Sequence, residues 1–193
     1  MKAFIRWDCL LLAAAFAWPA SAADFELGAL MEMLAAVPSA KDTFTETRTS
    51  AVLTAPLVLK GTLAYVRPDR LEKAVLAPYM DRTVISGDNV TVENRALKLA
   101  RTFSLASSTT VSALVESMRA TLAGDRAALE RHYTIQLEGR PEAWTLMLVP
   151  REQKLAAQVK RIQIAGVRER LKRVEIEEAT ADRSVMLISP DQP

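Results

Sequence analysis

Hydrophobic residues repeat along the chain with two different periods, and each change of period marks a change of element. The first apolar stretch, residues 25–37, has the spacing i, i+3, i+4 and i+7, which places its side chains on one face of a helix. Its members are Leu27, Leu30, Met31 and Leu34. Pro38 follows, and because proline cannot continue a helix, we expect the helix to end there.

From residue 42 onwards the period changes to two, which is typical of strands with one buried face. Gly87-Asp88-Asn89 consists of residues favoured in turns, which predicts a turn between two of these alternating stretches. The strands predicted in this half are residues 42–50, 58–66, 71–76, 82–86 and 90–92, with 96–103 closing a further hairpin. Successive strands are joined by short links, which favours antiparallel pairing.

A helical segment interrupts the strands in the middle of the chain. Its apolar residues have the spacing i, i+3, i+4, i+7 and i+11, and they are Val111, Leu114, Val115, Met118 and Leu122. Ser108 offers a cap in front of this helix, Gly124 a stop behind it, and Asp125 a cap for a short helix to residue 131. Alternation then returns in five predicted strands, residues 133–137, 143–149, 159–164, 168–176 and 184–188.

This order of elements predicts an α+β fold with a single antiparallel sheet of about 9–11 strands. A sheet of that size tends to curl, and the two helical elements must bury their apolar faces against it. We therefore expect a half-barrel whose concave face is covered by the N-terminal helix and a helical lid.

The first 22 residues have the features of a signal peptide. Lys2 and Arg6 give a basic start, and the apolar run that follows, residues 10–18, is shorter than the ~20 residues of a membrane-spanning helix. Ala20-Ser21-Ala22 matches the small-residue pattern of a signal-peptidase site. We expect cleavage after Ala22, which leaves residues 23–193 as one exported domain, periplasmic in a bacterium with two membranes. A retained membrane anchor is the alternative.

Composition and motifs give no support to catalysis. The formal net charge is only +2, so the composition does not indicate a basic surface for binding nucleic acid. The only cysteine, Cys9, lies in the predicted signal peptide. His132 is the only histidine, and the chain contains no nucleophile motif, no zinc ligand set and no glycine-rich phosphate loop. The basic run between residues 154 and 173 is interleaved with acidic residues, as in a solvated sheet face. We therefore expect no enzymatic activity, no cofactor and no metal.

Several strands are apolar on one side. Leu59, Leu63 and Tyr65 share one side of their strand, and Trp144, Leu146 and Leu148 share one side of theirs. Such stripes fit either an ordinary filled core or the wall of a hydrophobic cavity, and the pattern alone leaves both possibilities open.

One strand carries a more specific motif. Gly61-Thr62-Leu63, followed by Arg67-Pro68, resembles the G-x-L-x-x-x-R-P strand of the LolA family of periplasmic lipoprotein carriers. Shorter matches to that family are Phe44-Thr45-Glu46, residues 82–89, 144–150 and 174–176. The sequence also departs from the family pattern: Gly87-Asp88 inverts its Asp-Gly turn, Glu46 replaces a glutamine, and Leu71 and Lys73 stand where aromatic residues are favoured. These departures suggest a LolA-related branch.

The resemblance implies a carrier that shields acyl chains of a lipoprotein or related lipid and transfers them towards the outer membrane. It implies a monomer, an inner-membrane donor complex and an outer-membrane acceptor. Arg67 matches an arginine that bridges to the helical lid in the closed state. The cavity and lid residues expected on this basis are Leu30, Leu34, Phe44, Leu63, Tyr65, Arg67, Leu71, Leu114, Met118, Trp144 and Leu146. A non-catalytic envelope module with a filled core is the alternative.

Overall fold

Eleven strands and four α-helices occur in the part of the chain that the computed structural model describes, residues 25–94 and 96–191. The first half contains α1 (Leu27–Ala35), β1 (Ser39–Thr49), β2 (Leu57–Val66), β3 (Arg70–Ala77), β4 (Asp81–Ser86), β5 (Asn89–Asn94) and β6 (Leu99–Ser104). The second half contains the 3-10 helix η1 (Leu105–Ser107), α2 (Thr109–Ala123), α3 (Arg126–His132), β7 (Tyr133–Arg140), β8 (Ala143–Pro150), α4 (Gln153–Ala156), β9 (Val159–Val167), β10 (Arg170–Glu178) and β11 (Arg183–Pro190). The predicted signal peptide, residues 1–22, lies outside the described residues.

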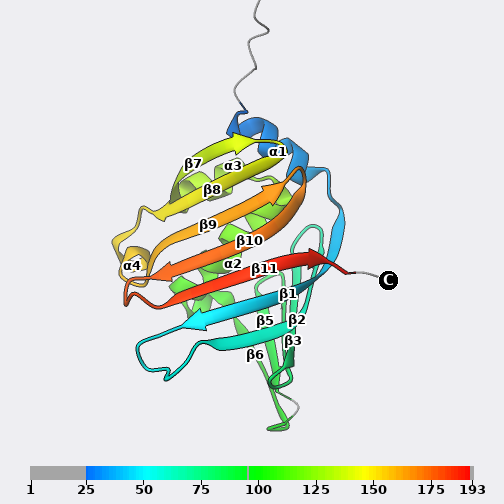
Figure 1. Cartoon of the computed structure of the whole chain (residues 1–193), viewed down its shortest axis with the longest axis vertical. Coiled ribbons are helices and arrows are strands. Elements are labelled where there is room, and N and C mark those ends of the chain that lie inside the picture. Colours follow the sequence, from blue (N-terminus) through cyan, green and yellow to red (C-terminus); the bar gives the residue numbers. More distant parts are fainter. Residues whose placement is uncertain (1–24, 95, 192–193) are drawn as a thin grey trace, which may run out of the picture.

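All eleven strands belong to one sheet with the order β6-β5-β4-β3-β2-β1-β11-β10-β9-β8-β7, and neighbouring strands are antiparallel. The first and last strands of the chain meet at its centre, where Phe44 of β1 lies opposite Gly61 of β2 and Ile188 of β11. β6 and β7 form the two edges, so the sheet stays open, and it wraps around α2 (Figure 1). The predicted antiparallel sheet with helices on one face is confirmed.

The ends of α2 and the start of α3 lie close to the predicted positions. The Ser108 hydroxyl accepts a hydrogen bond from the Val111 N–H at 3.3 Å, and Asp125 caps α3 through the Ala128 N–H at 2.9 Å. Gly124 ends α2 in the left-handed conformation with φ of 70°. A Cβ atom at Gly124 would lie 2.1 Å from the carbonyl oxygen of Met31, so this glycine also lets α1 and α2 approach each other closely.

Alternating residues of the strands point inward and form the main core with α1, α2 and α3. Leu146 and Ile164 have no exposed surface, and they lie opposite each other on β8 and β9. A second cluster of Phe44, Leu59 and Val75 fills the inner face of β1, β2 and β3. Most residues of the main core come from β7 to β10 and from α1. Tightly packed side chains therefore cover this part of the inner face more completely than the part formed by the other strands.

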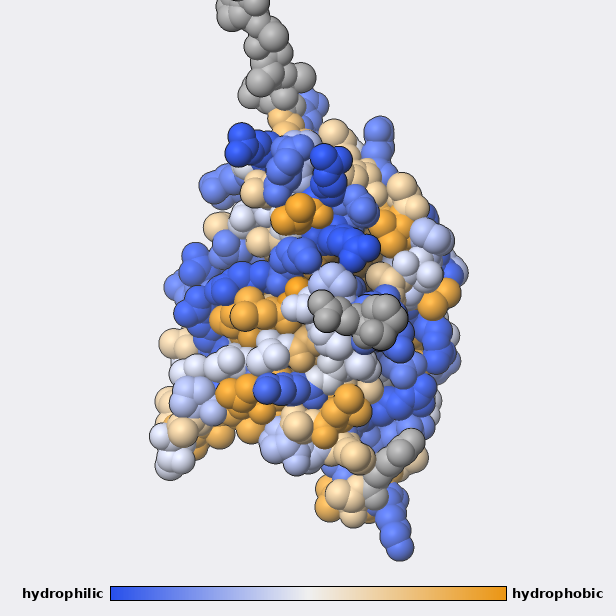
Figure 2. All heavy atoms as spheres, turned by 45° about the vertical axis from the view of Figure 1, so that its right-hand side comes forward, coloured by the Kyte–Doolittle hydropathy of each residue, from blue (hydrophilic) through white to orange (hydrophobic). Residues whose placement is uncertain are grey.

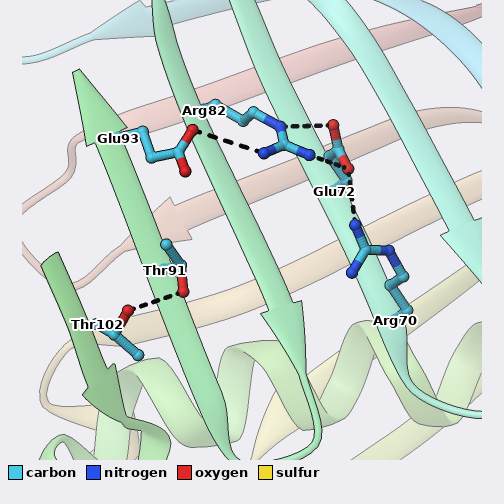
Figure 3. Close-up of polar contacts among 6 residues, drawn as sticks. All are labelled: Arg70, Glu72, Arg82, Thr91, Glu93 and Thr102. Atoms are coloured by element: carbon cyan, nitrogen blue, oxygen red, sulfur yellow. Dashed lines mark hydrogen bonds and ion pairs between the residues drawn. The ribbon is translucent and has the colours of Figure 1, made fainter. Parts of the chain in front are cut away.

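The outer face of the sheet carries several ion pairs beside exposed hydrophobic residues such as Leu76 and Leu187. Figure 3 shows Glu72 of β3 between Arg70 and Arg82, and Arg82 also contacts Glu93 of β5. In the basic run between residues 154 and 173, Arg173 donates to Glu175 at 2.6 Å on the same face. Hydrophilic and hydrophobic residues are interspersed over the side of the molecule seen in Figure 2.

The spacing of hydrophobic residues does not predict two short helices of the structure. η1 and α4 are only three and four residues long, too short for an apolar stripe to develop. The structure also shortens the N-terminal helix, which begins at Leu27 instead of residue 25 and has no side-chain cap on its N-cap residue, Glu26. No helix of the described residues is long and apolar enough to cross a membrane.

Candidate functional site

A cavity of about 700 Å³ lies between the inner face of the sheet, the link from α1 to β1, and the C-terminal half of α2. Its volume falls within the roughly 300–1,000 Å³ of small-ligand sites. The wall is mainly apolar, and its large hydrophobic side chains come from α1, α2 and five strands. They are Leu34, Leu63, Tyr65, Leu71, Ile85, Met118, Leu122, Val174, Ile176, Met186 and Ile188.

Strand register explains why these residues meet. Leu63 of β2 lies opposite Asp42 of β1 on one side and Lys73 of β3 on the other. One step along the strands, Tyr65 lies opposite Leu71, which in turn lies opposite Ile85 of β4. Since inward-facing residues recur at every second position, neighbouring strands in register place their inward side chains in rows across the cavity floor.

The predicted cavity residues fall into two groups. Leu34, Leu63, Tyr65, Leu71 and Met118 line the cavity. The remaining six do not: Leu30, Trp144 and Leu146 are fully buried in the main core, Leu114 packs against that core, Phe44 belongs to the second cluster, and Arg67 is exposed. The structure thus gathers one set of predicted residues around the cavity and places the other set in the packing that surrounds it.

Trp144 shows why inward-facing residues of β8 pack and do not line the cavity. Its Nε1 donates to the carbonyl oxygen of Arg168 at 2.8 Å, and its side chain lies over Gly166 of β9. A Cβ atom at position 166 would lie 2.2 Å from the indole ring. The glycine therefore makes room for the ring, and the hydrogen bond satisfies the one polar atom of the indole.

Two polar residues of the inner face form an ion pair at the cavity. Lys73 of β3 lines the cavity and donates a hydrogen bond to Glu46 of β1. Glu46 is 3% exposed and also accepts from Arg48 Nε and Ser184 Oγ, each at 2.7 Å. Burial raises the pKa of Glu46, but the hydrogen bonds from Arg48, Lys73 and Ser184 outweigh it and hold the pKa below its ordinary value.

Asp42 and Tyr65 add further polar groups to the wall. Burial raises the pKa of Asp42, although the nearby charges of Arg170 and Lys172 act in the opposite direction. Burial also raises the pKa of Tyr65, and among the described residues its buried hydroxyl has no hydrogen-bond partner. The cavity is therefore an apolar space with a small number of polar groups at defined places.

Arg67 connects the sheet to α1. It lies just beyond the end of β2, and its backbone N–H donates to the carbonyl oxygen of Pro38 at 3.0 Å. Its guanidinium donates to the carbonyl oxygen of Ala35, the last residue of α1. The arginine thus reaches a helix carbonyl, as the resemblance implies, but the helix is α1 and the side chain lies outside the cavity.

A second arginine, which sequence reasoning missed, connects the sheet to α2. Arg119 donates through Nε to the carbonyl oxygen of Asp69 at 3.1 Å and through a terminal nitrogen to that of Gly87 at 2.6 Å. Its terminal nitrogen also lies 3.4 Å from the Asp69 carboxylate. Only 14% of its side chain is exposed. The one signal in the sequence is its place beside the apolar stripe, four residues after Val115 and next to Met118.

Arg119→Met is expected to loosen α2 without unfolding the sheet. Hydrogen bonds from a charged donor are worth about 1.5–3 kcal/mol, so the free energy of opening α2 should fall by about 2 kcal/mol. Hydrogen exchange of peptides covering residues 109–123 measures this change. Arg126→Met is the matched control, because the side chain of Arg126 forms an ion pair with Glu130 on the surface of α3 and with no other of the described residues. Equal exchange of α2 in the two variants would refute the role of Arg119.

Comparison with known proteins places the chain in a family. The sequence matches the family model described as outer membrane lipoprotein carrier protein LolA-like over residues 19–190. The chain belongs to this LolA-like family. No curated protein matches the chain. Within the described residues, no cluster of His, Cys, Asp and Glu side chains has the arrangement of a metal site.

Solved structures resemble the LolA-like chain at low sequence identity. A LolA superfamily protein of Nitrosomonas europaea is 12% identical with a TM-score of 0.45, over 85% of this chain and 93% of that chain. A DUF1329 family protein of Desulfovibrio piger is 10% identical with a TM-score of 0.44, over 84% and 88%. A chain of the Pseudomonas aeruginosa MucA/MucB complex is 10% identical with a TM-score of 0.44, over 85% and 56%. At these values the likenesses carry no functional argument.

Proposed function

We propose that this LolA-like protein is a non-enzymatic periplasmic carrier that shields the acyl chains of a lipoprotein or related lipid from water. The observation that carries the proposal is the apolar cavity of about 700 Å³ beneath α1 and α2. Moving an acyl chain from water into such a cavity is favourable by about 0.8 kcal/mol for each buried methylene. The cavity also favours this function over an envelope module with a filled core.

Cargo has to enter and leave, so the helices must separate reversibly from the sheet. Arg67 holds the last carbonyl of α1, and Arg119 holds α2 to the turns at Asp69 and Gly87. Both contacts are polar and lie at one end of the sheet, where water can replace them when the helices move. We infer that these two arginines latch the empty cavity and that cargo competes with the latch.

We infer the wider pathway from what the family resemblance implies. The carrier would be exported through the signal peptide of residues 1–22, act as a monomer, and take cargo from an inner-membrane donor complex. It would release that cargo to an acceptor at the outer membrane.

Native mass spectrometry of the protein purified from the periplasm tests the carrier function, with acyl species bound to the protein as the expected result. A ligand-free protein that takes up no fluorescent acyl probe would contradict the proposal.

Arg67→Leu is expected to keep the fold and to slow cargo release. Removing a charged hydrogen bond worth about 1.5–3 kcal/mol removes the competitor of the cargo, so transfer should slow by about tenfold. Stopped-flow transfer of a fluorescent acyl probe from the protein to lipid vesicles measures the rate. Arg70→Leu is the matched control, because Arg70 is exposed and contacts Glu72 on the outer face. Identical rates in both variants would count against the latch.

A further inference from the structure

Lys73 of β3 lines the cavity from the inner face of the sheet, and among the described residues Lys41 and Arg170 are the other basic residues of the lining. Glu46 and Lys73 lie on β1 and β3, on either side of β2, and their side chains meet over its inner face. These are two of the positions at which the sequence departs from the pattern of the family it resembles. The structure shows that the two departures, 27 residues apart in sequence, form one ion pair.

The carboxylate of this pair has its partners within the protein. Glu46 Oε1 accepts from Arg48 Nε and Ser184 Oγ, while Oε2 accepts from Lys73. Its side chain is only 3% exposed, so a ligand has little access to it. The Glu46 carboxylate therefore fixes the position of Lys73 without itself forming part of the binding surface.

The ammonium group has hydrogen-bonding capacity left over. It carries three donor hydrogens, and in the part of the chain that the structure describes one hydrogen bond from it is found, to Glu46. Lys73 Nζ also lies 5.0 Å from the centre of the Phe44 ring, which provides no acceptor oxygen. The side chain retains 27% of its surface exposed and lines the cavity.

This geometry has a consequence for what the cavity can hold. A pure hydrocarbon that fills it would remove water from the Lys73 ammonium and give nothing in return, which costs free energy. A ligand oxygen beside Lys73 would accept the hydrogen bond that water gives up. A carboxylate ligand would in addition face the charges of Glu46 and Asp42, whereas an ester or amide carbonyl is uncharged.

We propose, on the basis of the acyl-carrier function above, that Lys73 is a specificity-determining residue that donates a hydrogen bond to an ester or amide carbonyl of the cargo. The cavity thereby prefers acyl groups in ester or amide linkage to hydrocarbons of the same length. Leu63, in the same row, and Leu71, in the next, contact the chain, and Lys73 positions its carbonyl end.

Competition binding tests the proposal with the protein produced from the full-length gene. Methyl dodecanoate and dodecane, which have acyl and alkyl chains of equal length, displace a fluorescent hydrophobic probe. The wild type should bind the ester at least tenfold more tightly than the alkane, as expected for one hydrogen bond from a charged donor. Lys73→Met should bring the two affinities together. Lys60→Met is the matched control, because Lys60 is exposed on the outer face of β2, and it should keep the preference.

A double variant keeps the test independent of the ion pair's contribution to folding. Glu46→Gln combined with Lys73→Met removes both charges at once, and it should lose the preference for the ester as Lys73→Met does. A preference for the ester that persists in Lys73→Met or in the double variant would overturn the proposal. Equal affinity for both ligands in the wild type would overturn it as well and leave the carrier function standing. Failure of the wild type to bind either ligand would instead refute the carrier function.

Discussion

Leu63→Trp is expected to abolish acyl binding while the protein stays folded. Leu63 lines the cavity on β2 between Asp42 of β1 and Lys73 of β3, and its side chain is only partly buried. An indole at this position would extend into the space that the acyl chain needs. Since the cavity offers empty volume, the cost to stability should stay at or below the ~1–3 kcal/mol of overpacking in a filled core. Fluorescence titration with an acyl probe should show at least a tenfold loss of affinity.

Leu187→Trp is the matched control for this experiment. Leu187 is 51% exposed and lies on the outer face of β11, so the same substitution there adds an indole away from the cavity. Its affinity for the probe should equal that of the wild type. If Leu63→Trp and Leu187→Trp bind the probe equally well, the acyl chain does not occupy the cavity.

Trp144→Ala is expected to show the opposite of Leu63→Trp: a large loss of stability, with no contact to the acyl chain removed. The indole is 2% exposed, packs over Gly166 and satisfies the carbonyl of Arg168. Truncating a buried tryptophan costs about 3–5 kcal/mol, and here a hydrogen bond is lost as well. Denaturant unfolding should show the loss as a lower free energy of unfolding.

Phe103→Ala provides the comparison for Trp144→Ala. Phe103 is 39% exposed on the edge strand β6, so its truncation should change the free energy of unfolding by about 1 kcal/mol or less. The folded fraction of Trp144→Ala should still bind the acyl probe with wild-type affinity. A stable Trp144→Ala variant that has lost binding would place Trp144 in the ligand site, contrary to its position in the core.

Local signals in the sequence predict much of this fold. The helix of residues 109–123, its Ser108 cap and its Gly124 stop depend on residues within a few positions of each other, and all three are present in the structure. Val111, the first residue of the predicted apolar stripe, is 37% exposed. The alternation of β2 likewise predicts that Leu63 and Tyr65 share a face. Such features follow from the periods of helices and strands, which do not depend on the remainder of the chain.

The site is harder to predict because it depends on which elements come to lie together. Trp144 and Leu63 have the same alternating pattern, but α1 and the neighbouring strands fill the space around Trp144 and leave the space above Leu63 open. The contact of Arg119 with Asp69 and Gly87 spans residues that are 50 and 32 positions from it in the sequence. The pairing of Glu46 with Lys73 likewise depends on the register of β1, β2 and β3.

Photocrosslinking tests the central claim most directly. A fatty-acid ester that carries a photoreactive diazirine in its chain is bound to the protein, irradiated, and located by peptide mass spectrometry. We predict crosslinks to residues of the cavity wall from β2, β3, α2 and β11, namely Leu63, Leu71, Met118 and Met186, and their loss in Leu63→Trp. Crosslinks confined to the outer face of the sheet, or unchanged in Leu63→Trp, would contradict the account of the cavity as the acyl-binding site.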